Sequence, residues 1–323
     1  MRVYVTGGTG FVGSNVARLY AEWHGLEVVA AGRSRPAGDL PSRFEPVDLL
    51  EPASLRASIR RNEPELVVHA AIRNDFARIY AERRVGWRAY VEATRAVVEA
   101  SNEVGAVVVT LSTDWVFDGT QAGADERTPP NPINYYGFLK AASELVTLER
   151  AHDGLVARIA GVNGVHWARP QAPRAQDAGF GYFVDALVAS LSEGRPFTVW
   201  ESPAINSAAT PSLASESAEM ILQLVRAGAR GTFHCCGGEP ATRLGLAEAA
   251  VDAFGLDRGL LRTGPPDPGL LPPAPVPYDT SLDARATAAA IGYELPSLRA
   301  LLEGFRLQRE TGEVRPLAQG VLR

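Results

Sequence analysis

Short apolar runs rich in β-branched residues alternate, in the first half of the chain, with longer segments whose apolar residues recur at helical spacing. The apolar runs lie at 2–6, 26–31, 43–47, 65–70, 106–112 and 155–160. The helical patterns lie at 11–24, 52–61, 76–104 and 135–152. Regular alternation of this kind predicts an α/β protein with a doubly wound parallel sheet, helices on both faces, and ligands at the carboxyl ends of the strands.

A glycine-rich loop directly follows the first strand-like run. Gly7, Gly10 and Gly13 have the spacing of a dinucleotide-binding fingerprint, which provides a tight turn, close approach to a pyrophosphate and close packing of helix on strand. The context that such a loop requires is present: a strand before it, and an amphipathic helix and a second strand after it. The loop therefore predicts a Rossmann nucleotide-binding domain, the alternative being a purely structural turn.

The pattern beyond this domain predicts a second, smaller α/β lobe that binds the substrate. The expected boundaries are 1–162 and 204–236 for the Rossmann domain, and 163–203 and 237–323 for the substrate-binding lobe. Further helices are expected at 180–193, 212–227, 242–255, 283–290 and 297–309, and strands at 197–200 and 231–236. Segment 263–278 contains seven prolines, which exclude a helix and predict an extended strap along the substrate lobe. The tail after Glu310 is expected to be poorly ordered.

The end of the second strand indicates which cofactor the domain prefers. NAD sites usually have an Asp or Glu there, whereas an Arg suits the 2′-phosphate of NADP. The chain reads Gly32-Arg33-Ser34-Arg35, without a carboxylate. Arg33 and Arg35 can form charge-assisted hydrogen bonds to a phosphate, and Ser34 adds a hydroxyl donor. NADP(H) is therefore favoured over NAD(H), the alternative being two solvated loop arginines.

Tyr136 and Lys140 stand four residues apart at the start of a helical pattern. Residues at this spacing share a helix face, so the ammonium can lie near the phenol and still reach a cofactor ribose. A phenol has a pKa of roughly 10, and a nearby positive charge lowers it. Tyr136 is thus a candidate proton donor or acceptor in ketone–alcohol redox chemistry. A chance pair on a solvated helix is the alternative.

Several motifs together resemble the extended short-chain dehydrogenase/reductases over the whole chain. They are Gly7-x-x-Gly10-x-x-Gly13, Asp48, His69-Ala70-Ala71, Ser112-Thr113 and Tyr136-x-x-x-Lys140. Segment 111–119, Leu-Ser-Thr-Asp-Trp-Val-Phe-Asp-Gly, is most similar to the dTDP-4-dehydrorhamnose reductase group, whose members carry Ser-Thr-Asp-Tyr-Val-Phe-Asp-Gly. Trp115 takes the place of the group's Tyr.

The resemblance implies roles for individual residues. Thr113 would hydrogen-bond the substrate carbonyl oxygen, Tyr136 would supply the proton, and Lys140 would bind the nicotinamide ribose and tune Tyr136. The three glycines would lie against the cofactor diphosphate. Further cofactor contacts are implied for Phe11 and Val12 through their amides, for Asp48 and Leu49 at the adenine, and for Ala70 and Ala71 near the nicotinamide-side ribose.

Departures from the group concern the substrate side of the pocket. The deoxysugar reductases tend to carry Arg-Thr-Ser-Trp after the sixth strand, where this chain has Arg158-Ile159-Ala160-Gly161 and so lacks the aromatic. The candidate substrate residues are Arg73, Thr113, Asp114 and Arg158. Asp114 equally suits a strand terminus that is satisfied by local side chains. Further basic groups that an anionic diphosphate could meet are His166, Arg169 and Arg174.

The implied function is NADPH-dependent reduction of a keto-sugar nucleotide. Sugar-nucleotide dehydratases follow the Thr with an Asp-Glu pair, and because Trp115 follows Asp114 here, dehydration is disfavoured. An epimerase or another carbonyl reductase of the same superfamily remains open. So does a regulatory subunit, since a reductase-like protein that partners methionine adenosyltransferase resembles the same group. The retained Thr113, Tyr136 and Lys140 favour an enzyme.

Composition narrows the remaining possibilities. The 323 residues, 46% of them apolar, can bury a sizeable core, and the net charge of −5 gives no basic footprint for nucleic acid. No apolar run approaches the length of a membrane span and no signal peptide is evident, so a cytoplasmic protein is expected. The five histidines and the pair Cys235-Cys236 lack ligand spacing, so no metal is expected. The helices 76–104 and 135–152 could form the homodimer contact that is common in the superfamily.

Overall fold

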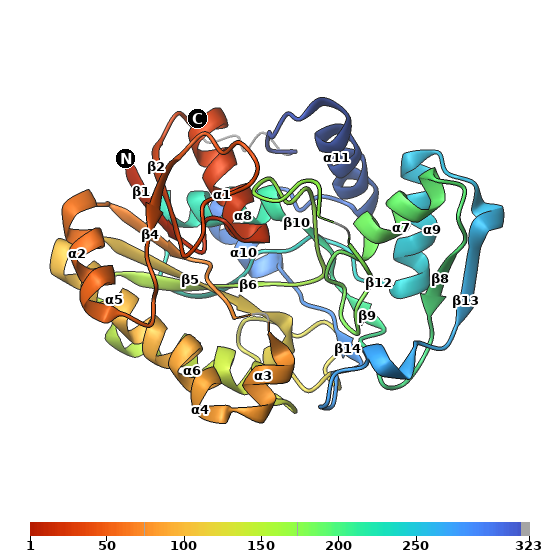
Figure 1. Ribbon diagram of the computed structural model, residues 1–323, viewed down its shortest axis with the longest axis horizontal. Helices are drawn as coiled ribbons and strands as arrows, with labels where there is room; N and C mark the ends of the chain where they lie inside the picture. Colours follow the sequence, from red (N-terminus) through yellow and green to blue (C-terminus); the bar gives the residue numbers. More distant parts are fainter. Residues whose placement is uncertain (74, 173, 318–323) are drawn as a thin grey trace.

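The computed structural model describes residues 1–73, 75–172 and 174–317. Its centre is a seven-stranded sheet in the order β11-β6-β5-β4-β1-β2-β3, in which every neighbouring pair is parallel (Figure 1). The strands are β1 (Arg2–Thr6), β2 (Glu27–Gly32), β3 (Arg43–Pro46), β4 (Leu66–His69), β5 (Val107–Thr113), β6 (Gly154–Ile159) and β11 (Gly231–His234). The predicted doubly wound sheet is confirmed, and its strand order reverses between β1 and β4, where such folds bind ligands.

Helices cover both faces of this sheet because successive strand residues point to opposite sides. Val3 and Val5 pack in a core with α1 (Phe11–Arg18) and α8 (Ala214–Arg226), whereas Tyr4 packs on the other face. That other face carries α2 (Pro52–Asn62), α5 (Ala93–Val104) and α6 (Tyr135–Arg150). A further helix, α10 (Arg285–Ile291), lies against α8 and β11 although the predicted boundary assigns it to the second lobe.

The single helix predicted over 76–104 is wrong. The segment consists of α3 (Phe76–Ala81), α4 (Arg83–Trp87), the π-helical turn η2 (Arg88–Glu92) and α5. Glu82 interrupts the helix with a non-helical backbone, φ −118° and ψ 76°. The bend brings Gly86 against α6, so closely that a Cβ there would lie 2.8 Å from a ring carbon of Tyr135. A second π-helical turn, η1 (Leu19–Trp23), extends α1.

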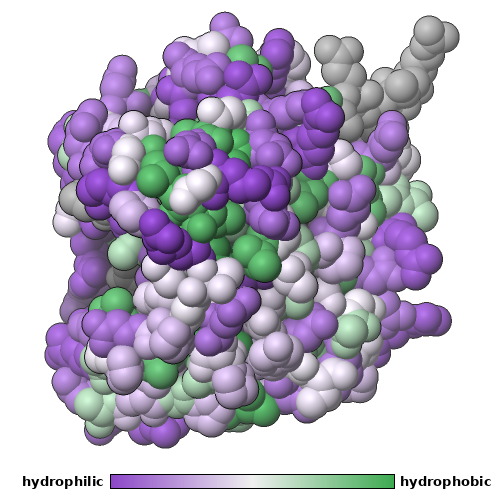
Figure 2. Space-filling view, turned by 90° about the vertical axis from the view of Figure 1, so that its right-hand side faces the viewer, coloured by the Kyte–Doolittle hydropathy of each residue, from purple (hydrophilic) through white to green (hydrophobic). Residues whose placement is uncertain are grey.

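The second lobe has its own apolar core beside the carboxyl ends of the sheet. It is built from α7 (Phe183–Ser192), β8 (Phe197–Trp200), α9 (Arg243–Phe254), β13 (Leu261–Gly264) and α11 (Leu298–Thr311). Figure 2 views the molecule from this side and shows apolar side chains gathered among polar ones on the upper part of the face. Short strands connect this lobe to the sheet: β7 (Val162–Asn163), β9 (Ala208–Ala209), β10 (Ser212–Leu213), β12 (Ala241–Thr242) and β14 (Asp279–Thr280).

Two predictions for the C-terminal third need correction. The proline-rich segment does not begin as a strap, because its first residues belong to β13 and pair with β8. The tail is ordered further than expected: α11 continues to Thr311, Val314 is buried, and the Leu317 amide donates a hydrogen bond of 2.7 Å to Glu216. Residues 318–323, to which the same prediction applied, lie outside the described residues.

Candidate active site

A cavity of about 820 Å³ opens at the carboxyl ends of β1, β2, β4 and β5 and extends to the second lobe. It brings together most of the residues that the sequence singled out. The predicted residues that line it are Gly7, Gly10, Phe11, Val12, Arg33, Ser34, Asp48, Leu49, Ala70, Ala71, Arg73, Thr113, Asp114, Tyr136 and Lys140. Gly13, Arg35 and Arg158 are not among the lining residues.

The glycine-rich loop has the shape that a diphosphate requires. Gly7 has φ +68°, and a Cβ there would lie 2.6 Å from the Ala71 Cα. A Cβ on Gly13 would lie 2.2 Å from the Gly7 carbonyl oxygen, so Gly13 serves the packing of α1 on β1. Gly10 precedes α1 without a side-chain cap, which leaves amides of the first turn available to an anion.

The adenosine end of the cavity lies at the end of β2. Arg33 and Ser34 are exposed and line the cavity, whereas Arg35 turns its guanidinium over the Phe44 ring, 5.5 Å from the centroid. The Asp48 carboxylate accepts a hydrogen bond of 3.0 Å from the Leu50 amide, which fixes the turn after β3. Of the three residues predicted to bind a 2′-phosphate, Arg33 and Ser34 thus line the cavity, whereas Arg35 packs on the Phe44 ring.

Three buried polar atoms on the lining have no hydrogen-bond partner among the described residues: Ser112 Oγ, Arg73 Nε and His166 Nδ1. Buried polar groups in folded proteins are nearly always paired. Polar atoms of this kind suit the hydroxyl, amide and phosphate groups of a dinucleotide or a sugar nucleotide. Together with the glycine loop, they make the cavity a good fit for a nicotinamide dinucleotide.

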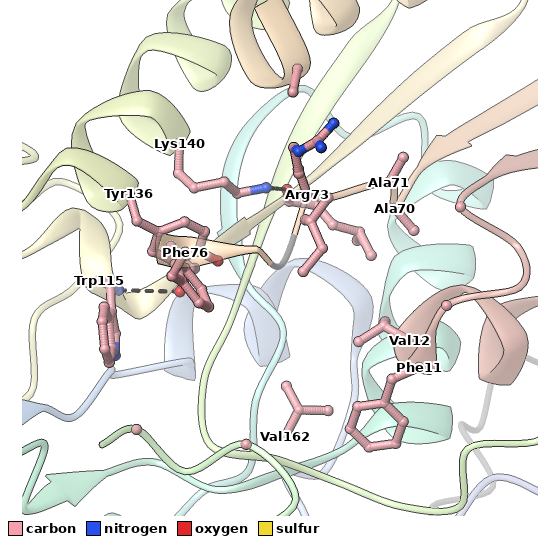
Figure 3. A pocket seen from close by; sticks show the side chains of 18 of the residues that line it. Phe11, Val12, Ala70, Ala71, Arg73, Phe76, Trp115, Tyr136, Lys140 and Val162 are labelled. Atoms are coloured by element: carbon pink, nitrogen blue, oxygen red, sulfur yellow. Dashed lines mark hydrogen bonds between the residues drawn. The ribbon is translucent and has the colours of Figure 1, made fainter. Parts of the chain in front are cut away.

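The three predicted catalytic residues line one end of the cavity. Figure 3 shows Tyr136 and Lys140 on the same side of it, next to Trp115. Thr113 ends β5, and Tyr136 lies in the first turn of α6. The Asn134 side chain starts that helix by accepting a hydrogen bond of 2.9 Å from the Gly137 amide. Lys140 lies one turn further, buried, with its ammonium donating to the Leu111 carbonyl of β5.

The electrostatics differ from the expected tuning of Tyr136 by Lys140. Burial raises the pKa of Tyr136, hydrogen bonding with Thr113 opposes that rise, and the Asp114 carboxylate adds to it. Burial also lowers the pKa of Lys140 to about 8. The predicted lowering of the Tyr136 pKa is therefore wrong for this arrangement, and Tyr136 holds its proton at neutral pH.

Aromatic rings surround the Tyr136 phenol on three sides. Phe76, Tyr90 and Trp115 meet its ring edge-on, with centroids 5.2, 5.9 and 6.0 Å away. Tyr90, in the π-helical turn η2, donates a hydrogen bond of 2.8 Å to the Arg73 carbonyl oxygen and so fixes the loop after β4. This role was not visible in the sequence, because it depends on the break in the predicted long helix.

The wall opposite the sheet is largely apolar. It comprises Trp115, Phe180 and the proline-rich segment 270–275, in the sequence Leu-Leu-Pro-Pro-Ala-Pro. Trp115 and Leu271 pack in one apolar cluster, and a Cβ on Gly179 would lie 3.1 Å from the Trp115 indole. Sequence reasoning placed the segment on the substrate lobe but did not identify it as part of the cavity lining.

The comparisons with known proteins agree with this geometry. The family described as "RmlD substrate binding domain" matches residues 1–308. The chain belongs to this family. The extended short-chain dehydrogenase/reductase resemblance is thereby supported, and the family is one of sugar-nucleotide reductases similar to dTDP-4-dehydrorhamnose reductase.

Two curated relatives illustrate the range of proteins similar to this RmlD family member. The methionine adenosyltransferase 2 subunit beta of Xenopus tropicalis is 26% identical over 303 residues, covering 91% of this chain and 84% of the relative. The dTDP-4-keto-6-deoxy-D-glucose reductase of Streptomyces niveus is 27% identical over 268 residues, covering 82% and 83%.

Solved structures share the fold. A hypothetical dTDP-4-dehydrorhamnose reductase from Sulfolobus tokodaii has a TM-score of 0.74 and 27% identity, covering 92% of this chain and 98% of its own. The dTDP-4-dehydrorhamnose reductase of Bacillus anthracis, solved with NADP, has a TM-score of 0.76 and 20% identity, covering 95% of this chain and 99% of its own.

In the part of this family member that the structure describes, no helix has the length and apolar character needed to cross a membrane.

Arg158, predicted to contact substrate, has a different role in this family member. Its side chain is 3% exposed and forms a two-contact ion pair with Glu144 of α6, at 2.9 and 2.8 Å. The guanidinium lies over the Phe117 ring, 5.1 Å from the centroid. Alternation along β6 turns Arg158 towards α6, and its neighbour Ile159 lines the cavity instead.

The other basic residues considered for a diphosphate lie near the cavity. Arg73, His166 and Arg169 line it, and Arg174 lies over the Tyr182 ring, 4.4 Å from the centroid. Burial, together with the nearby arginines, lowers the pKa of His166 to about 4, so its imidazole is neutral. The cationic groups on this side are therefore the arginines.

Proposed function

We propose that the protein reduces a keto-sugar nucleotide with NADPH, Tyr136 being the proton donor. The observation that carries the proposal is the meeting of Thr113, Tyr136 and Lys140 at one end of a cavity whose other end is the glycine-rich loop. Membership of the RmlD family and similarity to a dTDP-4-keto-6-deoxy-D-glucose reductase support it. The apolar wall of Trp115 and segment 270–275 suits the methyl group of a 6-deoxy sugar.

The residues have separate tasks in this reaction. The nicotinamide cofactor, when bound, supplies the hydride. Tyr136 holds a proton on its buried phenol and gives it to the substrate oxygen. Lys140, buried at the Leu111 carbonyl, holds the nicotinamide-side ribose, and Thr113 fixes the phenol from the end of β5.

The preference for NADPH is part of the proposal and depends on the end of β2. Arg33 and Ser34 line the cavity there, and the three residues directly after β2, Arg33-Ser34-Arg35, include no carboxylate to receive a ribose 2′-hydroxyl. Arg33→Asp should reduce the ratio of kcat/KM with NADPH to that with NADH by at least about tenfold, since a charge-assisted hydrogen bond is lost. An unchanged ratio would contradict this preference.

The test of the reaction is Tyr136→Phe, assayed by NADPH oxidation with dTDP-4-keto-6-deoxyglucose. Turnover should fall by roughly 10²-fold or more, while NADPH affinity stays within about twofold, because the phenol acts only as the acid. Tyr135→Phe is the matched control: its hydroxyl donates to the Arg83 carbonyl, 2.6 Å away and outside the cavity lining, and its rate should be unchanged. Equal rates in both variants would remove Tyr136 from the mechanism.

A regulatory role is the second candidate, because the chain is similar to the methionine adenosyltransferase 2 subunit beta over most of its length. The two functions make different predictions for the wild-type protein. A regulatory subunit would bind NADPH but oxidise none with keto-sugar nucleotides, and would change the rate of a methionine adenosyltransferase. The retained catalytic trio favours the reductase.

We also propose a homodimer that forms through α6. Phe138, Leu145 and Leu148 are 50%, 61% and 40% exposed and follow helical spacing along one side of this helix. Large apolar side chains gathered on one helix face are typical of a protein–protein contact. α5 and η2 lie beside α6. Figure 1 shows α5 and α6 as neighbours at the lower left of the molecule.

A further inference from the structure

A continuous chain of buried hydrogen bonds connects the second lobe to the catalytic Thr113. Arg243, the first residue of α9, donates to the Asn206 carbonyl oxygen through Nε at 3.3 Å and Nη2 at 3.2 Å. The Asn206 amide nitrogen Nδ2 donates to the Thr280 hydroxyl at 3.0 Å, and that hydroxyl donates to Oδ2 of Asp114. Asn206 and Thr280 are 0% and 1% exposed, so water does not compete for these bonds.

The chain ends at the hydroxyl beside the proton donor. Thr113 donates through Oγ1 to Oδ1 of Asp114 at 3.0 Å, and the Trp115 amide donates back to that hydroxyl at 3.3 Å. Asp114 therefore fixes the direction of the Thr113 O–H bond. The same hydroxyl interacts with the Tyr136 phenol, where its hydrogen bonding opposes the rise of the Tyr136 pKa that burial causes.

We propose that Thr280 is a positioning residue for the reductase: by donating to Asp114 it holds the carboxylate that orients the Thr113 hydroxyl beside Tyr136. The inference rests on the proposed function for its kinetic consequence. Thr280 reaches neither substrate nor cofactor, since it does not line the cavity. Its effect on the reaction passes through Asp114 and Thr113.

The pKa of Asp114 provides a second way, besides kinetics, to detect the hydrogen bond from Thr280. Burial raises the pKa of Asp114 to about 6, and the hydrogen bonds from Thr280 and Thr113 oppose the rise. The other titratable groups that interact with this carboxylate in the described residues are Tyr136 of α6 and Cys236, which follows β11. Removal of the Thr280 hydroxyl should therefore raise the Asp114 pKa further.

A second buried threonine, Thr210, provides a matched control for a purely structural effect. Thr210 is as buried as Thr280 and lies beside the same segment. Its hydroxyl donates to the Leu282 carbonyl at 2.9 Å and accepts from the Leu282 amide at 3.0 Å. Replacing either threonine by valine removes one buried hydroxyl, but only Thr280→Val removes a bond to Asp114.

The first experiment compares Thr280→Val, Thr280→Ser and Thr210→Val in NADPH oxidation with dTDP-4-keto-6-deoxyglucose. Thr280→Val should lower kcat at least about tenfold, since misplacement of a reacting group by ~1 Å costs on the order of 10²-fold, with KM changed less than about twofold. Thr280→Ser, which keeps the hydroxyl, should restore kcat, and Thr210→Val should leave it near the wild-type value. Equal losses in the two valine variants, no loss in Thr280→Val, or its failure to fold would each overturn the proposal.

The second experiment needs no substrate and so separates this inference from the proposed function. The Asp114 carboxyl is titrated by ¹³C NMR in protein labelled at the aspartate carboxyl carbon, with Asp114→Asn to assign the signal. The titration midpoint should rise in Thr280→Val and stay unchanged in Thr280→Ser and Thr210→Val. An unchanged midpoint in Thr280→Val would refute the inference. If the wild-type protein reduces no keto sugar while the midpoint still rises in Thr280→Val, the proposed function is refuted and the effect of Thr280 on Asp114 stands.

Discussion

The buried ion pair between Arg158 and Glu144 allows a test of how the sheet is held to α6. Both side chains are 3% exposed, and the two contacts at 2.9 and 2.8 Å join the guanidinium to both carboxylate oxygens. Arg158→Met removes the cation and leaves the Glu144 carboxylate unpaired in the interior. Breaking a buried pair in this way costs about 3–5 kcal/mol of the free energy of unfolding.

The double variant Arg158→Met/Glu144→Leu distinguishes the loss of a pair from the loss of packing. With both charges gone, the desolvation cost of each disappears as well. The free energy of unfolding should return to within about 1 kcal/mol of the wild-type value, or exceed it. Unfolding in guanidinium chloride, followed by circular dichroism, measures Arg158→Met, Glu144→Leu and the double variant in one series.

The same series tests the original interpretation of Arg158 as a substrate residue. If the residue only supports the fold, the double variant keeps the wild-type KM for the keto-sugar nucleotide. A KM that rises tenfold in a stable double variant would return Arg158 to the substrate site. A single variant that loses less than about 1 kcal/mol would refute the argument from burial.

Three further predictions concern other parts of the molecule. Burial raises the pKa of Glu216 from 4.5 to about 7, so its contribution to stability is complete below about pH 4.5 and is lost as the pH rises through 7. The free energy of unfolding of Glu216→Gln, measured in urea, should therefore increase relative to that of the wild type between pH 5 and 8, by up to about 3 kcal/mol. A difference between the two proteins that does not depend on pH would contradict this. Gly13→Ala should weaken NADPH binding at least about tenfold in fluorescence titration, because its Cβ would lie 2.2 Å from the Gly7 oxygen, whereas Gly245→Ala should bind normally. If the proposed homodimer forms through α6, Leu145→Glu should give a monomer in light scattering, and a monomeric wild type would exclude that dimer.

The fold and the cofactor loop were predictable because their signals are local. Parallel strands covered on both faces are apolar throughout, so runs such as 106–112 identify them without knowledge of their neighbours. The glycine spacing follows from sterics: Gly7 has positive φ, and Gly13 has no room for a Cβ. The meeting of Tyr136 with Thr113 followed from positions at a strand end and in the first turn of a helix.

The errors and omissions arise where a side chain depends on distant parts of the chain. Successive residues of a strand point to opposite sides, and Arg158 therefore faces α6 although its neighbour Ile159, the last residue of β6, lines the cavity. Thr280 and Asp114 are 166 residues apart, and no periodicity connects them. The break falls at Glu82, which is not a helix-breaking residue type, and the contact of Gly86 with α6 that accompanies it is made with a distant part of the chain.

The surroundings of Tyr136 bear on the direction of the reaction. Burial and the Asp114 carboxylate both raise its pKa, while the Lys140 ammonium is held at the Leu111 carbonyl. A phenol that keeps its proton is a donor, as the reduction of a ketone requires. An epimerase needs the same group as a base in its oxidative half, which these surroundings disfavour. Because the loop at Arg33 independently suits the 2′-phosphate of a reducing cofactor, two ends of one cavity favour net reduction.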